Sequence, residues 1–328
     1  MRLKSDSRQS QDSRSDMDRP LTISIVAPIY GVEKYISRFS ESVLCQTYPH
    51  IQYVFVNDGT KDASVEILND LIDTRFSHLR SRIIIVDKQN GGLPAARKTG
   101  MEYVTGDYVW HVDSDDWVEE DAVERIVSRI NETGCDILYF DFLKEYADRS
   151  KPKYENDYSA SDRMLYIRNM YNHKAFGCVW NKCIRRSLYI DNEIYFPKFS
   201  YAEDTYLMSQ LVGYSSSIAH LKGSLYHYRK DNLQAITKQN RKKRRREYAM
   251  NFLDLYEKYR DVPSGENPVE VIFDDILIQA GWYSVFYGLD LFTKYPYLAK
   301  AVRKARIRCG SDVWIPAQLL VKIYALFR

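Results

Sequence analysis

The chain has 328 residues, of which 45% are hydrophobic and 28% are charged, and its net charge at pH 7 is +3. These values are typical of a folded globular protein, and no apolar run reaches the ~18 residues that a transmembrane helix needs. A membrane-spanning protein is therefore not expected, and so small a net charge argues against nucleic acid as a partner.

The first residues and the cysteines indicate a cytoplasmic protein. Residues 1–20 are mainly serine, glutamine and charged residues without the apolar segment of a signal peptide, so we expect a disordered charged tail there. The five cysteines include no Cys-x-x-Cys pair, which favours reduced thiols over disulfides or a zinc site.

Short β-rich runs alternate with helical patterns from residue 22 to residue 142. Strands are predicted at residues 23–29, 51–56, 82–86, 108–112 and 135–142. A helix is predicted after each of the first three, and Pro94, which follows a glycine turn, suits the first turn of the third helix. This alternation favours an α/β fold whose central sheet is mostly parallel and has helices on both faces.

Three of these strands end in distinctive motifs. Pro28 and Tyr30 end the first strand, Asp58 ends the second and Asp113 ends the fourth. Because ligands bind at the carboxyl edge of such sheets, these motifs are expected to converge on one cleft. The carboxylate of Asp58 can accept the N3-H of a uracil ring and Tyr30 can stack on it; a turn-forming aspartate and a packed tyrosine are the alternatives.

The most informative stretch places Asp113, Asp115 and Asp116 directly after a strand. Clustered carboxylates need a compensating positive charge, and hard oxygen ligands suit Mg²⁺ or Mn²⁺, ions that often accompany a diphosphate. The carboxylates of Asp113 and Asp115 stand at alternate positions and can face one ion. The alternative is a capped helix start, a role that Asp116 alone could fill.

A second acidic pair, Glu203 and Asp204, opens a helix predicted at residues 201–212. One of the two could act as a general base toward an acceptor hydroxyl, and N-terminal capping is the alternative. Lys88 and Arg97 flank the Asn-Gly-Gly turn and could neutralise a diphosphate, although surface cations mostly have no specific role.

The segments that follow the nucleotide-binding pattern are less distinctive. Residues 148–161 are polar and are expected to form a surface loop. His220 and His227 are expected on a hairpin, where His227 is the better candidate for a further metal ligand; a packed or solvent-facing imidazole is as common.

The end of the chain is expected to be entirely helical, with segments near residues 241–259, 268–292, 296–308 and 313–327. Residues 241–246 and 303–308 are strongly basic, and residues 314–327 are aromatic and apolar. Such a region could contact an anionic membrane face, whereas solvated basic faces or a dimer contact are the alternatives.

Taken together, the motifs resemble those of the family 2 glycosyltransferases, inverting nucleotide-sugar enzymes of the GT-A type that serve bacterial surface polysaccharide assembly. The matching segments, in the family's order, are residues 26–30 (VAPIY), 56–60 (VNDGT), 90–97 (NGGLPAAR), 112–116 (VDSDD), 180–182 (WNK) and 203–204 (ED). Two positions depart from the pattern: Lys98 stands where asparagine is usual, and His111 stands where an apolar residue is common.

The resemblance implies a Rossmann-like GT-A domain over residues 21–235, with a nucleotide-binding half (21–130) and an acceptor-binding half (131–235), followed by a C-terminal helical region (236–328). It implies transfer of a hexose or N-acetylhexosamine from a UDP-sugar, with Mn²⁺ or Mg²⁺, to a saccharide or polyprenyl-diphosphate-linked acceptor. The reaction would belong to capsule, O-antigen or exopolysaccharide assembly, and the cytoplasmic protein could bind peripherally to the inner face of the plasma membrane.

The same resemblance implies a role for each site residue. Uridine would be held by Pro28, Tyr30, Glu33 and Asp58. Asp113 would meet the ribose or the metal. Apart from the resemblance, Lys88, Arg97 and Ser114 are expected to contact the rest of the nucleotide-sugar. The metal would be bound by Asp115 with Asp113, and Asp204 would be the general base with Glu203 beside it.

Three other classes fit the sequence less well. A dinucleotide-dependent oxidoreductase needs Gly-x-Gly-x-x-Gly after the first strand, where Gly31 is a single glycine. A metal-dependent phosphohydrolase could use Asp113 and Asp115 but would leave Asp58 and Asp204 without roles. A non-catalytic sugar-binding protein predicts no metal-dependent loss of a UDP-sugar.

Overall fold

The computed structural model describes residues 19–233, 235–238, 240–287 and 290–300. Its strands are β1 (Ile23–Ile29), β2 (Ile51–Asn57), β3 (Ile83–Asp87), β4 (Tyr108–His111), β5 (Trp117–Val118), β6 (Ile137–Glu145), β7 (Ser150–Lys153), β8 (Lys182–Arg185) and β9 (Ile218–Arg229). Its α-helices are α2 (Ile36–Leu44), α3 (Ser64–Arg75), α4 (Leu93–Met101), α5 (Ala122–Thr133), α6 (Arg163–Tyr171), α7 (Arg186–Ile190), α8 (Glu203–Tyr214), α9 (Arg241–Tyr259), α10 (Phe273–Tyr287) and α11 (Asp290–Lys294). Short 3₁₀ turns are η1 (Ser77–Arg82), η2 (Ile236–Lys238) and η3 (Glu270–Ile272).

All the described strands join one sheet with the order β3-β2-β1-β4-β8-β6-β9-β5, and β7 pairs with β6. The first half, β3-β2-β1-β4, is parallel, as predicted from the alternation of strands and helices. In the second half β8 runs antiparallel to both of its neighbours, β4 and β6, while β6 and β9 are parallel. The sheet as a whole is thus mixed, and its parallel half carries the strand ends that were expected to form the site.

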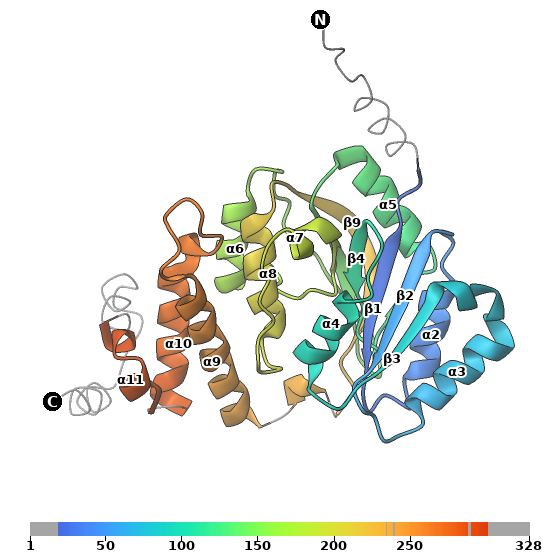
Figure 1. Cartoon of the computed structure of the whole chain (residues 1–328), viewed down its shortest axis with the longest axis horizontal. Coiled ribbons are helices and arrows are strands. Elements are labelled where there is room, and N and C mark those ends of the chain that lie inside the picture. The colour runs from blue at the N-terminus through green and yellow to red at the C-terminus, as the bar shows by residue number, and fades with distance from the viewer. Residues whose placement is uncertain (1–18, 234, 239, 288–289, 301–328) are drawn as a thin grey trace, which may run out of the picture.

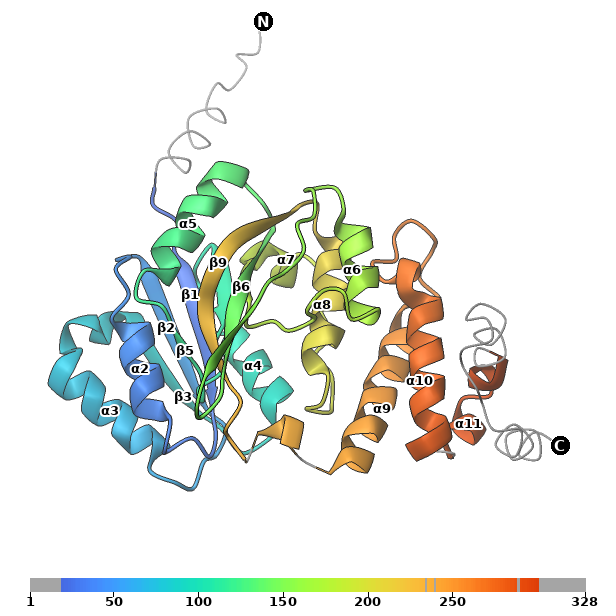
Figure 2. The same cartoon turned by 180° about the vertical axis from the view of Figure 1, so that it is seen from behind.

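Helices cover both faces of the sheet because side chains of alternate residues in a strand point to opposite faces. In β1, Ile23, Ile25, Ala27 and Ile29 belong to the core that also contains side chains of α2, α3 and α5. Val26 of the same strand belongs to the core on the other face, where α4, α6, α7, α8 and the later helices pack. The two views show α2 and α3 on one side of the sheet and α4 on the other (Figures 1 and 2).

Two predictions for the second half of the domain were wrong. The expected hairpin around His220 and His227 is a single long strand, β9, whose pairing with β6 shifts register beside Asp141. Gly223 has φ +113 and lies at this irregularity, where a side chain would strain the backbone. The polar segment expected to be a surface loop contains β7, whose residues are mostly exposed, as suits an edge strand.

The C-terminal helices α9 and α10 pack against each other and against α8 and α6, at the end of the molecule farthest from α3 (Figures 1 and 2). The predicted helix at residues 241–259 is confirmed with these bounds. Most of the predicted N-terminal tail and the predicted helix at residues 313–327 lie outside the described residues, as does most of the helix predicted at residues 296–308.

Candidate active site

A cavity of about 740 Å³ opens at the carboxyl ends of β1, β2 and β4 and continues past the start of α8 to α9. This volume is within the range of ordinary ligand pockets. Most residues predicted for the site line it: Pro28, Tyr30, Asp58, Asp113, Ser114, Asp115, Glu203 and Asp204. Glu33, Lys88, Arg97 and His227 do not line it.

The acidic loop after β4 is held in place by β1 and β9. The Ser114 hydroxyl donates to the carbonyl oxygen of Pro28 at 2.6 Å. The Tyr226 hydroxyl of β9 donates to Asp116 at 2.7 Å and accepts from the backbone N–H of Asp113 at 3.1 Å. Asp116 therefore does not cap a helix, since α5 begins only at Ala122; it anchors the loop.

The segment after β9 supplies a further support that the sequence reasoning missed. The Asn232 side-chain amide donates to the Asp115 carboxylate at 2.7 Å, and the Arg229 guanidinium donates to the Asp115 carbonyl oxygen at 2.8 Å. Nothing in the local pattern singles out Asn232, because more than a hundred residues separate it from Asp115. Asn232 bonds the Oδ2 atom of Asp115, so these two contacts do not involve the other carboxylate oxygen, Oδ1.

Arg97 is the centre of the acidic part of the site. Its guanidinium donates to Asp113 at 2.8 Å, to Glu203 at 2.9 Å and also to Asp204. The side chain of Arg97 is 0% exposed, so this charge is fully enclosed by the protein. Arg97 thus joins the loop after β4 to the start of α8. Its guanidinium is therefore not free to contact a diphosphate, which is the role predicted for it from the sequence.

Burial and mutual repulsion shift the pKa values of these acids. Burial raises the pKa of Asp113 to about 6, with Arg97 opposing the shift and Asp204 adding to it. Burial, followed by the neighbouring Asp204, raises the pKa of Glu203 well above its usual range. Glu203 is therefore a weaker acid than an ordinary glutamate, and a single guanidinium faces three carboxyl groups.

The carboxylate of Asp58 organises the glycine turn before α4. It accepts from the backbone N–H groups of Gly91 at 2.9 Å and Gly92 at 2.8 Å, and from the Lys88 ammonium at 2.6 Å. Gly92 has φ +84 and a Cβ there would lie 3.0 Å from the Ser200 hydroxyl, so glycine suits this position. Lys88 thus holds Asp58, and one Asp58 oxygen, with a single N–H partner, keeps the capacity to accept a second hydrogen bond.

Tyr30 and Glu33 follow β1 but differ in position. Tyr30 lines the cavity with 56% of its surface exposed, so its ring is accessible to a planar ligand. Glu33 is exposed and accepts from the backbone N–H of Ala63, just before α3. Glu33 thus supports the start of α3, and it does not line the cavity.

Neither histidine of β9 reaches the acidic loop. The ring nitrogens of His227 lie 2.7 Å from Glu145 and 2.8 Å from Glu119, so both are engaged. In His220, Nε2 lies 3.0 Å from Asp141 and Nδ1 lies 2.5 Å from Asp157. The structure therefore does not bring His227 to Asp115, and we leave His227 out of the proposed metal site.

The two departures from the family pattern have different surroundings. Lys98 is exposed on α4. His111 is fully buried, 3.3 Å from the Tyr189 hydroxyl, and burial followed by the nearby Arg97 lowers its pKa well below the usual value. His111 is thus a neutral polar residue beneath the Arg97 cluster.

The carboxylates of Asp113 and Asp115 fit a divalent cation. Both line the cavity, both are oxygen donors, and burial raises the pKa of each, which indicates negative charge that the protein alone does not compensate. Among the described residues no group of three or more His, Cys, Asp or Glu forms a preformed metal cage. Two carboxylates are nevertheless sufficient for an ion that takes its other ligands from phosphates and water.

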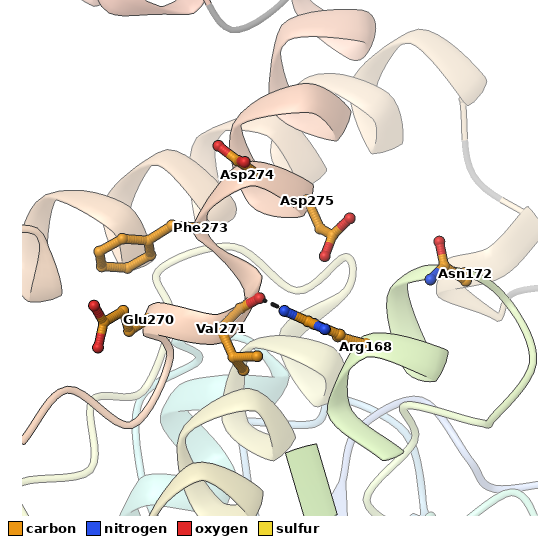
Figure 3. A pocket seen from close by; sticks show the side chains of 7 residues that line it. All are labelled: Arg168, Asn172, Glu270, Val271, Phe273, Asp274 and Asp275. Carbon is orange, nitrogen blue, oxygen red and sulfur yellow. Dashed lines mark hydrogen bonds between the residues drawn. The ribbon is translucent and has the colours of Figure 1, made fainter. Parts of the chain in front are cut away.

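A second cavity of about 550 Å³ lies between α6 and the start of α10 (Figure 3). Three carboxylates, Glu270, Asp274 and Asp275, line it together with Arg168, which donates to the Val271 carbonyl oxygen at 3.4 Å. It shares no residue with the first cavity, and its acidic character does not suit a phosphate-bearing ligand.

Comparison with known proteins defines the family. The sequence profile of glycosyl transferase family 2 matches residues 24–192, more than half of the 328 residues. The chain belongs to glycosyl transferase family 2. This assignment confirms the family predicted from the ordered motifs.

One sequence relative in the family is the glycosyltransferase GlyA of Streptococcus pneumoniae. It is 34% identical over 220 residues, which cover 63% of this chain but only 30% of GlyA. The chain thus spans about a third of this relative.

Among the described residues of the present chain, no helix is both long enough and apolar enough to cross a membrane.

Two solved structures share the fold. A crystal structure of Staphylococcus aureus TarS (residues 1–349) with UDP-GlcNAc matches with a TM-score of 0.63 at 19% identity, covering 86% of this chain and 79% of that one. The mannosyltransferase PcManGT of Pyrobaculum calidifontis, solved with GDP-Man and Mn²⁺, matches with a TM-score of 0.52 at 15% identity, covering 96% and 86%. These likenesses confirm the predicted fold class: a GT-A-type α/β sheet with helices, followed by C-terminal helices.

Replacing Asp58 by alanine is expected to destabilise the protein by about 2–4 kcal/mol, because it leaves two backbone N–H groups and the Lys88 ammonium without their charged acceptor. Urea unfolding would measure the loss. Asp87→Ala is the matched control, since Asp87 ends the neighbouring strand, is exposed and bonds only the Asn57 side chain among the described residues. Equal losses in the two variants would show that Asp58 does not organise the turn.

Binding of Mn²⁺ by this family member is expected to weaken as the pH falls through about 6, the raised pKa of Asp113. Below that pH a proton competes with the ion for the carboxylate, so the association constant should drop about tenfold per pH unit, while above pH 7 it should level off. Electron paramagnetic resonance of free Mn²⁺ measures this directly. An association constant unchanged between pH 5 and pH 7 would contradict the assignment of Asp113.

Proposed function

We propose that the protein transfers a hexose or N-acetylhexosamine from a UDP-sugar to a hydroxyl of a saccharide acceptor, with inversion at the anomeric carbon. The observation that supports this most is that Asp204 and Glu203 of α8 line the same cavity as Asp113 and Asp115, and that Arg97 joins both of them to Asp113. Family membership supports the reaction class.

In this proposal the uridine lies at the ends of β1 and β2. The exposed ring of Tyr30 covers the uracil, and the Asp58 oxygen with spare capacity accepts the N3-H. Ser114 and Asp113 face the ribose and diphosphate from the loop after β4.

Asp204 is the proposed general base. Its side chain is 18% exposed, against 8% for Glu203, and Arg97 holds one of its oxygens. Because burial and Asp204 favour the protonated form of Glu203, that carboxyl is less available to accept a proton. Asp204 thus takes the proton of the attacking hydroxyl as the new glycosidic bond forms on the face opposite to the departing UDP.

Mn²⁺ or Mg²⁺ is the proposed cofactor, held by Asp113 and Asp115. When bound there, such a cation would offset the negative charge that grows on the departing UDP. The structure of PcManGT with Mn²⁺ supports an ion of this type in a related fold.

The acceptor is proposed to belong to capsule, O-antigen or exopolysaccharide assembly, and it is expected to be lipid-linked. Within the basic run at residues 241–246, we propose membrane contact for residues 241–243 alone, because residues 244–246 have partners within the protein. Arg245 lies over the Tyr283 ring, Arg244 over the Tyr201 ring, and Arg246 pairs with Asp290 at 2.6 Å. Residues 241–243 remain exposed, and the other candidate segments, residues 303–308 and 314–327, lie outside the described residues.

The test of the function is incubation of the full chain with Mn²⁺ and a panel of UDP-sugars, followed by nuclear magnetic resonance of the released sugar. We expect thermal stabilisation by UDP and slow hydrolysis of one or a few donors, with the first-formed sugar inverted and EDTA abolishing turnover. If no UDP-sugar is bound or consumed, or if the configuration is retained, the proposal is wrong.

A further inference from the structure

The cavity has an aromatic wall that leads away from the acidic loop. Behind it lies Tyr226, a fully buried residue whose hydroxyl contacts Asp113 and Asp116. The Trp180 ring stacks on Tyr226 at 4.5 Å and on Tyr228 at 5.1 Å between ring centroids. Both Trp180 and Tyr228 line the cavity. Flat aromatic surfaces of this kind suit the apolar faces of sugars or polyols. This wall is therefore a suitable binding surface for an acceptor beside the proposed reaction centre.

Lysines gather where this wall ends. Lys144 lines the cavity and pairs in register with Tyr228. Lys153 lies on the adjacent strand β7, and the Lys230 ammonium lies 4.7 Å from the centre of the Tyr228 ring. Lys238, at the end of η2, is close enough to Lys230 to repel it. We call these four residues, Lys144, Lys153, Lys230 and Lys238, the lysine collar.

Within the described residues, the lysine collar has no ion-pair partner. No carboxylate lies within 4.0 Å of these four ammonium groups in the part of the chain that the structure describes. Burial, then Lys153 and Lys230, lowers the pKa of Lys144, and burial followed by Lys238 lowers the pKa of Lys230. Such mutual repulsion is unfavourable unless an anion occupies the space between the lysines.

The start of α9 closes the same end of the cavity. Lys243, Glu247 and Tyr248 line it together with residues 235–237. Lys243 and Glu247 pair loosely at 3.7 Å, so they largely neutralise each other. The positive charge at this end of the cavity therefore comes mainly from Lys144, which lines it, with the other three collar lysines close behind.

We propose that the lysine collar binds a phosphate group that the acceptor molecule carries, while the aromatic wall of Trp180 and Tyr228 packs against its sugar or polyol units. The inference rests on the proposed function and narrows its acceptor to phosphate-bearing compounds, either a phosphodiester-linked chain or a diphosphate-linked saccharide. A neutral glycan would leave the clustered lysines uncompensated.

The test uses the full chain in EDTA at low salt, where the acidic donor end, without a metal ion, repels anions. Calorimetry measures binding of a soluble glycerol phosphate oligomer, of neutral maltohexaose and of phosphatidylglycerol vesicles. The parent protein should bind the oligomer more tightly than maltohexaose. Lys144→Gln/Lys230→Gln should weaken oligomer binding about tenfold or more, and Lys144→Arg/Lys230→Arg should restore most of it.

The matched control is Lys222→Gln/Lys258→Gln, which removes the same charge from exposed positions in the first half of β9 and on α9 away from the cavity lining. It should change oligomer binding less than twofold. Thermal unfolding of each variant checks that it is folded. The inference is overturned if the parent protein does not bind the oligomer, or if Lys144→Gln/Lys230→Gln and the control variant lose the same oligomer affinity. It is also overturned if vesicle binding depends on Lys144 and Lys230 but oligomer binding does not.

Binding of UDP with Mn²⁺ is measured on the same preparation of the parent protein. Failure of that binding would count against the proposed function itself. Intact UDP binding without lysine-dependent oligomer binding would overturn only the phosphate-bearing acceptor.

Discussion

Asp204→Asn is expected to lower the rate of UDP-sugar turnover about 10²- to 10⁴-fold, the usual contribution of a general base. Asparagine has nearly the same shape and can still accept from Arg97 through its carbonyl oxygen, but it cannot take a proton from the attacking hydroxyl. UDP binding in the presence of Mn²⁺ should persist. The rate of UDP release, measured on the donor that the parent hydrolyses, gives the loss.

The adjacent Glu203 offers the matched control. Burial and Asp204 favour the protonated form of Glu203, which glutamine resembles, so Glu203→Gln should lower turnover less than tenfold. If Glu203→Gln were the more damaging change, or if Asp204→Asn turned over at the parent rate, the assignment of the base to Asp204 would be wrong.

Arg97→Met is expected to destabilise the ligand-free protein by about 3–5 kcal/mol at pH 7.5, since it removes the fully buried guanidinium that bonds Asp113, Glu203 and Asp204. Methionine has a similar volume, so the loss is mainly electrostatic. Urea unfolding measures it. The matched control is Lys98→Met on the same helix, where the exposed side chain should change stability by less than about 0.5 kcal/mol.

The sign of the pH dependence follows from the raised pKa of Asp113. The folded-state pKa of about 6 exceeds the ordinary value of 3.8, so the folded protein binds more protons than the unfolded chain between these values. The contribution of this group to stability is therefore present below about pH 4 and is lost as the pH rises to about 6. Without Arg97 the carboxylates retain protons more strongly, so the deficit of Arg97→Met should shrink at pH 5. A deficit that is equal at pH 5 and pH 7.5 would show that charge is not its cause.

Sequence patterns were sufficient for the parallel half of the fold. The strand at residues 23–29 has the predicted bounds, because it is a short apolar run that is buried along its whole length. Outside that half, the helix at residues 241–259 also has the predicted bounds. The strand β9 was not predictable in this way, since Gly223 and nearby polar residues indicate a turn unless the pairing with β6 is known. The short strand β7 is polar and exposed, so its pairing with β6 leaves no hydrophobic pattern.

The candidate site was predictable where residues end a strand or open a helix, as Asp58, Asp113 and Asp204 do. Contacts between distant segments were not. Arg97 precedes Asp204 by 107 positions, so its role as the partner of three carboxylates depends on how α4 and α8 pack. For the same reason the pattern gave no indication that Asn232 supports Asp115 or that both nitrogens of His227 are engaged by glutamates.

The account depends on acids from separate segments meeting around one divalent cation beside UDP. A crystal of the full chain grown with UDP and Mn²⁺, with diffraction collected at the manganese absorption edge, tests this directly. We predict one anomalous peak in contact with Asp113 or Asp115 and with the diphosphate, with the uracil beside Tyr30 and Asp58. Bound UDP with no anomalous peak at these carboxylates, or a peak elsewhere in the molecule, would contradict the account.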